Sequence, residues 1–304
     1  MTPTAEPLRP GAAPPAPLDR ILFSSPLVQI GKFRVRPEDP RFHDSGPIER
    51  HILVFPRTPV WIRHEGQAPF LADPEIVPCY NRGQVYRRDS VRGMPDRCEW
   101  FAFPAEVLQS VLAERDPAVA ERPASPFPFR KAPGDFRSYF EQRRLVEALS
   151  GPAPPEPMEV EETVLGLLGR LLPAACDAAG IGNRGRVRRP ARLDRDLVEN
   201  AKAELSRSLG APAKLGDVAA RLEVSPFRLC RTFRRETGTT VHRYRNGLRL
   251  AASLELLRRP AGGVTNVALS LGFSSHSHFT AAFRQAYGTT PREIRRPSGF
   301  RSTR

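Results

Sequence analysis

Residues 218–240 read VAARLEVSPFRLCRTFRRETGTT, and residues 267–290 read VALSLGFSSHSHFTAAFRQAYGTT. The two stretches align from their first Val-Ala pair to their closing Gly-Thr-Thr, with one extra residue in the second. The chain therefore repeats one short helical unit in degenerate form. Two copies of a unit rich in cations suggest a protein that holds a long, regular, anionic polymer at two points, and duplex DNA is the obvious candidate.

Each copy has the pattern of a helix-turn-helix. In the first copy, apolar residues recur at helical spacing before a turn, and Ser225 can then cap a second helix. Leu229 and Phe233 lie four residues apart and form the buried stripe of that second helix, which Gly238 ends. The matching residues of the second copy are Phe279, Phe283 and Gly288.

Residues 241–257, which lie between the copies, predict one continuous helix. Seventeen residues at a rise of ~1.5 Å give a length of roughly 25 Å. That length is comparable to one turn of B-DNA, ~34 Å. A single chain could therefore place its two second helices in successive major grooves on one face of the duplex.

One set of residues in and just after the second copy forms a signature: Ala268, Gly272, Phe273, Phe279, Phe283, Arg284, Gly288, Thr290, Pro291, Ile294 and Arg295. By these residues, the stretch from about Leu193 to Arg296 resembles the DNA-binding domain of AraC/XylS-type transcription regulators, over about a third of the chain. The resemblance implies seven helices, two of them recognition helices, and usually activation of transcription. In most members the rest of the chain is a sensor or dimerisation domain.

The distribution of charge agrees with a nucleic-acid partner. Residues 181–304 carry 25 Lys and Arg against nine Asp and Glu, whereas the first 180 residues carry 22 cations and 24 anions. The whole excess of +14 therefore lies in the C-terminal part. Such asymmetry favours an acidic partner, although a merely soluble basic domain would show it too.

The resemblance assigns base-reading positions on both second helices. In the first unit, Arg231 could bind a guanine edge and Phe227 could meet a thymine methyl group. Ala281 stands where well-known members have a longer polar side chain, so we expect more permissive reading by the second unit. The base-reading positions are Phe227, Cys230, Arg231, His276, Ser277, Thr280 and Ala281. For Cys230, a space-filling thiol is the competing interpretation.

Four further side chains on these helices are better interpreted as phosphate contacts, which position a protein on DNA without specifying a sequence. They are Arg234, Arg235, Arg284 and Gln285. The alternative for any one of these arginines is a solvated helix face without a role in binding.

The N-terminal part predicts many short strands and then helices, so the fold class is α+β with two domains. Apolar or alternating segments between residues 21 and 103 favour a small barrel or sandwich. The resemblance implies a cupin-like β-barrel here, although no HxH cluster followed by a carboxylate occurs. The expected strands are 27–30, 33–35, 51–55, 60–62, 76–77 and 100–103, and the expected helices are 106–115, 135–149 and 158–175.

The expected domains follow from these patterns. They are a disordered Pro-rich tail over 1–20, a sensor or dimerisation domain over 21–179, a basic linker over 180–192, the DNA-binding domain over 193–296 and a tail over 297–304. The apolar stripe of the 158–175 helix suggests a homodimer seam, with packing against its own barrel as the alternative. No apolar run is long enough for a membrane span and no signal peptide is visible, so we expect a cytoplasmic protein.

Chemistry-bearing residues of the N-terminal part give no strong motif. His43, His51 and His64 could converge with Cys79 or Cys98, but their spacing fits no ligand pattern, so no metal and no cofactor is expected. An organic effector in the barrel is an open alternative. Its pocket could use the aromatic residues Trp61, Tyr80, Tyr86 and Trp100 and the cations Arg63, Arg82 and Arg87.

Three functions compete. The first, which we favour, is a sequence-specific transcription regulator, an activator that binds double-stranded promoter DNA, contacts RNA polymerase and responds to a small-molecule effector. The second is a regulator whose N-terminal domain only oligomerises. The third is an enzyme such as a DNA-repair alkyl transferase, which needs a reactive Cys in a Pro-Cys-His-Arg context. Here Pro78-Cys79 continues into Tyr80-Asn81, so an enzyme is not expected.

Overall fold

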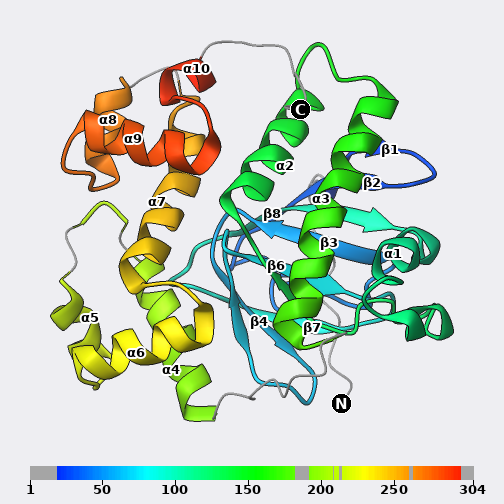
Figure 1. Cartoon of the computed structure of the whole chain (residues 1–304), viewed down its shortest axis with the longest axis horizontal. Coiled ribbons are helices and arrows are strands. Elements are labelled where there is room, and N and C mark those ends of the chain that lie inside the picture. The colour runs from blue at the N-terminus through cyan, green and yellow to red at the C-terminus, as the bar shows by residue number, and fades with distance from the viewer. Residues whose placement is uncertain (1–18, 182–191, 208, 212–213, 260–262, 296–304) are drawn as a thin grey trace, which may run out of the picture.

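The computed structural model describes residues 19–181 and 192–295, apart from residues 208, 212–213 and 260–262. The predicted tail over 297–304, almost all of the predicted tail over 1–20 and most of the predicted linker lie outside the described residues. The described chain has an N-terminal region of strands and helices beside a C-terminal region made of helices (Figure 1). No described helix is both long and apolar enough to cross a membrane.

Two antiparallel sheets form the N-terminal region. The larger sheet has the order β1 (Asp19–Ser24), β2 (Gln29–Val35), β8 (Asp96–Phe103), β3 (His51–Pro56), β6 (Ile76–Tyr80) and β9 (Lys131–Pro133). The smaller has the order β5 (Phe70–Ala72), β4 (Val60–His64) and β7 (Tyr86–Ser90). The expected α+β organisation is therefore confirmed, but among the described strands neither sheet closes on itself, so the cupin-like barrel stays a prediction.

Alternation along the strands gives the larger sheet two apolar faces. On β3, Leu53 and Phe55 join the core that the helices cover, whereas Ile52 and Val54 face the core shared with the smaller sheet. Successive side chains of a strand point to opposite faces, so one strand serves both cores. The second core also holds an ion pair, because Arg88 reaches Asp96 at 3.2 Å inside it.

Three helices cover the first face of the larger sheet: α1 (Ala105–Leu112), α2 (Phe136–Ala148) and α3 (Pro157–Ala179). Figure 1 shows α2 and α3 running across the strands. The apolar stripe of α3, from Val160 to Leu172, is buried in this core. That stripe therefore packs within its own domain, which was the alternative to a dimer seam.

The C-terminal region has seven helices within the described residues. They are α4 (Arg192–Ser206), α5 (Leu215–Arg221), α6 (Pro226–Thr237), α7 (Val241–Leu256), α8 (Val264–Ser270), α9 (His276–Tyr287) and α10 (Pro291–Arg295). The pairs α5–α6 and α8–α9 are the two predicted helix-turn-helix units, and α7 is the predicted connecting helix. Gly238 and Gly288 end α6 and α9 in the left-handed conformation that favours glycine.

The two regions are packed against each other. The Phe140 ring of α2 stacks on Tyr287 at the end of α9, with ring centroids 4.9 Å apart. On α4, Glu199 accepts a hydrogen bond of 2.8 Å from the backbone N–H of Leu71 and pairs with Lys131 at 3.1 Å. The second helix-turn-helix unit therefore contacts the sheet domain directly, through Tyr287, whereas the first is joined to it through α4, which shares a core with α6.

Candidate nucleic-acid interface

The first candidate recognition helix is α6, whose start is fixed by local sequence. The Ser225 hydroxyl accepts a 3.2 Å hydrogen bond from the backbone N–H of Arg228, and Pro226 occupies the first helical position. Leu229 and Phe233 are fully buried, as their spacing predicts. With that stripe buried, the opposite face of α6 is turned to solvent.

The exposed face of α6 carries the predicted base-reading residues of the first unit. Phe227 is 74% exposed, an unusual position for a large apolar ring, and Cys230 and Arg231 are exposed on the same helix. Among the described residues, neither Arg231 nor Arg234 takes part in an ion pair, so both guanidinium groups are available to an external anion.

Arg235 is held differently from its neighbour Arg234. Its Nη2 lies 2.6 Å from a carboxylate oxygen of Asp194 on α4, and its Nε lies 2.7 Å from Glu236. These contacts raise the pKa of Arg235. Its donors are thus engaged within the protein, which weakens the prediction that Arg235 binds a phosphate.

The second candidate recognition helix, α9, contributes to a shallow concave surface with a volume of about 650 Å³. Ser275 caps the helix by accepting a 3.1 Å hydrogen bond from the backbone N–H of His278. All six predicted contact residues of this unit line the surface, together with Thr290. They are His276, Ser277, Thr280, Ala281, Arg284 and Gln285.

The two recognition helices differ in charge and in polar groups. Helix α6 carries four arginines, whereas α9 carries Arg284 alone. The Oγ1 of Thr280 is shielded from solvent and has no hydrogen-bond partner among the described residues. In this conformation, Thr280 and Ala281 therefore offer a partner little beyond apolar contact, whereas α6 offers cations.

Two exposed residues of this surface escaped the sequence analysis. Arg228 lies one turn before Arg231 on α6, and the spacing of three residues was the signal that could have identified it. His278 is exposed on α9, where its Nδ1 lies 3.1 Å from the Ser274 hydroxyl and its ring meets the edge of Phe273. Both lie beside residues that the sequence did single out.

The candidate metal ligands of the N-terminal region do not converge. Within the described residues, no three His, Cys, Asp or Glu side chains lie close enough to hold a metal ion. His64 stands among the rings of Phe70, Tyr80 and Tyr86, and burial lowers its pKa to about 4. It is a neutral core residue at neutral pH.

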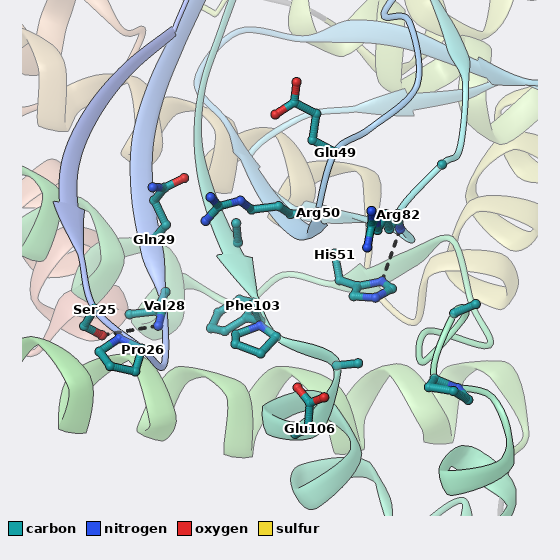
Figure 2. Close-up of a pocket in the computed structure, with 16 residues that line it drawn as sticks. Ser25, Pro26, Val28, Gln29, Glu49, Arg50, His51, Arg82, Phe103 and Glu106 are labelled. Carbon is teal, nitrogen blue, oxygen red and sulfur yellow. Dashed lines mark hydrogen bonds between the residues drawn. The ribbon is translucent and has the colours of Figure 1, made fainter.

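The suggested effector residues are dispersed over the sheet domain. The rings of Tyr80 and Tyr86 stack on each other in the core between the sheets, at a centroid distance of 4.6 Å. The indole N–H of Trp100 donates to Asp19 at 2.6 Å. Arg82 alone of the suggested cations lines a cavity of about 810 Å³, which lies between the ends of several strands and the start of α1 (Figure 2).

The comparison with protein families matches residues 218–297 to a helix-turn-helix domain. The HTH-type transcriptional activator RhaS of Escherichia fergusonii is 42% identical over 78 residues, which are 26% of this chain and 28% of that protein. RhaS of an Escherichia coli strain is 40% identical over the same number of residues. The chain thus spans 28% of the length of these curated relatives.

Residues 218–297 are an AraC-type helix-turn-helix domain. Among solved structures, an AraC-type regulator from Chromobacterium violaceum is 30% identical and covers 33% of this chain and 89% of its own, with a TM-score of 0.32. ToxT of Vibrio cholerae, in complex with an unsaturated fatty acid, is 10% identical and covers 88% of this chain and 95% of its own, with a TM-score of 0.38. The AraC-type domain holds α5 to α10, both candidate recognition helices included.

Proposed function

We propose that this protein is a sequence-specific DNA-binding regulator of transcription. The supporting observation is that the exposed faces of α6 and α9 carry the residues that the AraC resemblance assigns to base reading, in a helical region that packs against the sheet domain. α6 provides exposed cations for anchoring and specificity, and α9 provides a concave surface with apolar contacts. Double-stranded promoter DNA is the partner, with one recognition helix in each of two successive major grooves.

The finer assignments belong to the same proposal. The protein acts as a cytoplasmic activator that contacts RNA polymerase, in keeping with the relatives named as activators. The sheet domain over 21–179 is the sensor, joined by a basic linker to a DNA-binding domain over 193–296, and it controls DNA occupancy through a small-molecule effector. Active molecules are homodimers. Because the α3 stripe is buried, a dimer would have to use another surface.

Footprinting on DNA upstream of the protein's own gene and neighbouring genes tests the proposal. We expect protection over about two helical turns per chain that survives competitor DNA at two salt concentrations. The double variant Phe227→Ala/Arg231→Ala should lose this protection, whereas Arg36→Ala, a control on the sheet domain, should keep it. Binding that competitor DNA removes at every salt concentration would show a non-specific basic domain and would contradict the proposal.

A further inference from the structure

A cavity on the sheet domain has the features of a small-molecule site. Its volume of about 810 Å³ falls within the range of ~300–1,000 Å³ that is usual for ligand pockets. Its walls come from the turn before β2, the start of β3, the segment after β6 and the start of α1. Figure 2 shows that it lies at the ends of strands, and none of its lining residues belongs to the packed core between the two sheets.

One wall of the cavity carries two arginines and Glu49, whose carboxylate Figure 2 shows pointing away from both of them. Arg50 and Arg82 both line it, and neither side chain takes part in an ion pair with any described residue. Guanidinium groups match carboxylates in geometry and bind them through paired hydrogen bonds. Two arginines without internal partners on one cavity are therefore suited to an anionic group of a ligand.

The opposite wall is acidic. Glu106 lies in the first turn of α1, and Figure 2 shows its carboxylate turned toward the cavity from the side away from Arg50 and Arg82. Its side chain has no hydrogen-bond or ion-pair partner among the described residues. An anionic ligand alone would meet repulsion there, whereas a ligand with an ammonium group at its far end would be attracted.

The floor between the two walls is largely apolar. Phe103 and Val28 are buried there, beside a ring of Pro26. His51 is only 6% exposed, and its Nδ1 accepts a 3.1 Å hydrogen bond from the backbone N–H of Arg82. Burial lowers the pKa of His51, so the neutral ring carries its proton on Nε2 and can donate from that atom.

We propose that this cavity binds a small amino-carboxylate whose charges lie at opposite ends, such as an ω-amino acid or a short peptide. The carboxylate pairs with Arg50 and Arg82, the ammonium group pairs with Glu106, and the apolar chain lies over Phe103. As the effector site, this assignment rests on the proposed function, but binding itself needs no DNA.

Titration calorimetry of the full chain without DNA tests the assignment. The probes are ε-aminocaproate and glycylglycine, with hexanoate and hexylamine as the two half-molecules. We expect at least one of the two amino-carboxylates to bind at millimolar concentration, about tenfold or more tightly than either half-molecule. Absence of binding by both amino-carboxylates, or binding of each that is no tighter than that of hexanoate, would overturn the proposal.

Variants then assign the two ends of the ligand. Glu106→Gln should weaken binding of the amino-carboxylate about tenfold and leave hexanoate unaffected, whereas Arg50→Ala and Arg82→Ala should each weaken both. Arg36→Ala, at an exposed site away from the cavity, is the matched control. All four side chains are exposed, so their replacement should not disturb the fold. An unchanged unfolding temperature for each variant would verify this. If Glu106→Gln does not weaken binding of the amino-carboxylate, the ammonium site is refuted. Because the calorimetry uses no DNA, its outcome is independent of whether the DNA footprint is found.

Discussion

At the scale of single residues, Arg231 is the sharpest test of base reading. It is exposed on α6 without an ion-pair partner among the described residues, one turn after Phe227. We predict that Arg231→Ala costs ~1–3 kcal/mol of binding free energy on the specific site and relaxes the preference at one base pair. Binding titrations on a set of single-base-pair changes measure both effects. An equal loss on every sequence would instead place Arg231 on a phosphate.

Arg284 should behave in the opposite manner. It lies on the concave surface of α9 and is interpreted as a phosphate contact. We predict that Arg284→Ala weakens binding on all sequences alike and reduces the slope of log affinity against log salt by ~0.9. Arg235→Ala is the matched comparison and should change the salt slope less, because the donors of Arg235 are already engaged by Asp194 and Glu236. A salt slope that Arg284→Ala leaves unchanged would count against the phosphate role.

At the scale of elements, α7 depends on close contact with the sheet domain. A methyl group on Gly247 would lie 2.6 Å from Cε1 of Phe136 on α2 and would also collide with the half-buried Glu75. We predict that Gly247→Ala separates the two regions, although alanine favours a helix. Differential scanning calorimetry should then show two transitions in place of one.

Gly169→Ala is the control for this prediction. Gly169 also lies within a helix, α3, but a methyl group there would meet nothing within 4 Å. Its replacement should leave the number of transitions unchanged and raise stability slightly, because alanine is the better helix former. A single transition for both variants would show that the contact at Gly247 does not couple the regions.

The sequence predicted the helical elements well because their signals are local. The cap at Ser225, the stripe of Leu229 and Phe233 and the stop at Gly238 lie within one helix, and α6 forms where they place it. The strands were harder. The sequence suggested two strands, one on each side of Gly31, but a single strand, β2, runs through it. Glycine is needed within this strand because a methyl group there would come within 2.5 Å of the Trp100 ring.

Strands whose burial depends on distant partners escaped prediction altogether. The strand β7 reads YRRDS, which is too polar for the usual pattern, yet Arg88 is buried within it. The ion pair with Asp96 and the ring of Phe33, 4.7 Å from the guanidinium carbon, compensate that charge. Neither partner is adjacent in sequence. The cavity of Figure 2 was missed for the same reason, since separate segments build its walls.

At the scale of the whole molecule, two carboxylates lie where α7 meets the sheet domain: Asp73, which is buried, and Glu75, which is half-buried. Asp73 accepts a hydrogen bond from the Tyr244 hydroxyl, and Glu75 lies against Gly247. Burial raises the pKa of Asp73 to about 6, and burial together with Asp73 raises the pKa of Glu75 to about 8. Both carboxyl groups therefore keep their protons to a higher pH in the folded protein than in the unfolded chain.

These shifts fix the sign of a pH dependence. The folded protein binds more protons than the unfolded chain between the ordinary carboxyl pKa of ~4 and the raised values, so the stabilising effect of protonation is complete below ~4 and is lost as pH rises through them. We predict that the free energy of unfolding falls between pH ~4 and ~8, with the last part of the fall due to Glu75. Denaturant titrations should show a smaller fall for Glu75→Gln, and Glu65→Gln, on an exposed turn, is the control. Equal falls in all three proteins would contradict the assignment to Glu75.

The contact between α7 and the sheet domain also includes a cluster of ion pairs. Glu255 of α7 pairs with Arg143 of α2 at 2.6 Å and also with Arg57, and both arginines reach Glu99 on β8. Arg57 directly follows β3, and the opposite ends of β3 and β8 border the cavity. These two paired strands thus connect the proposed ligand site to the helix between the recognition units.

Because α7 is held against the sheet domain, the proposed DNA site is constrained in the spacing of its two half-sites. With the sheet domain fixed to α4, α7 and α9, the two recognition helices keep one separation and one rotational phase about the duplex axis. Inserting a single base pair between the two half-sites turns one of them by ~34° relative to the other, since a helical turn holds ~10–10.5 base pairs. A clamped pair of helices cannot follow that rotation. The promoter sites of this protein should therefore share one invariant spacer length, even where their base sequences diverge.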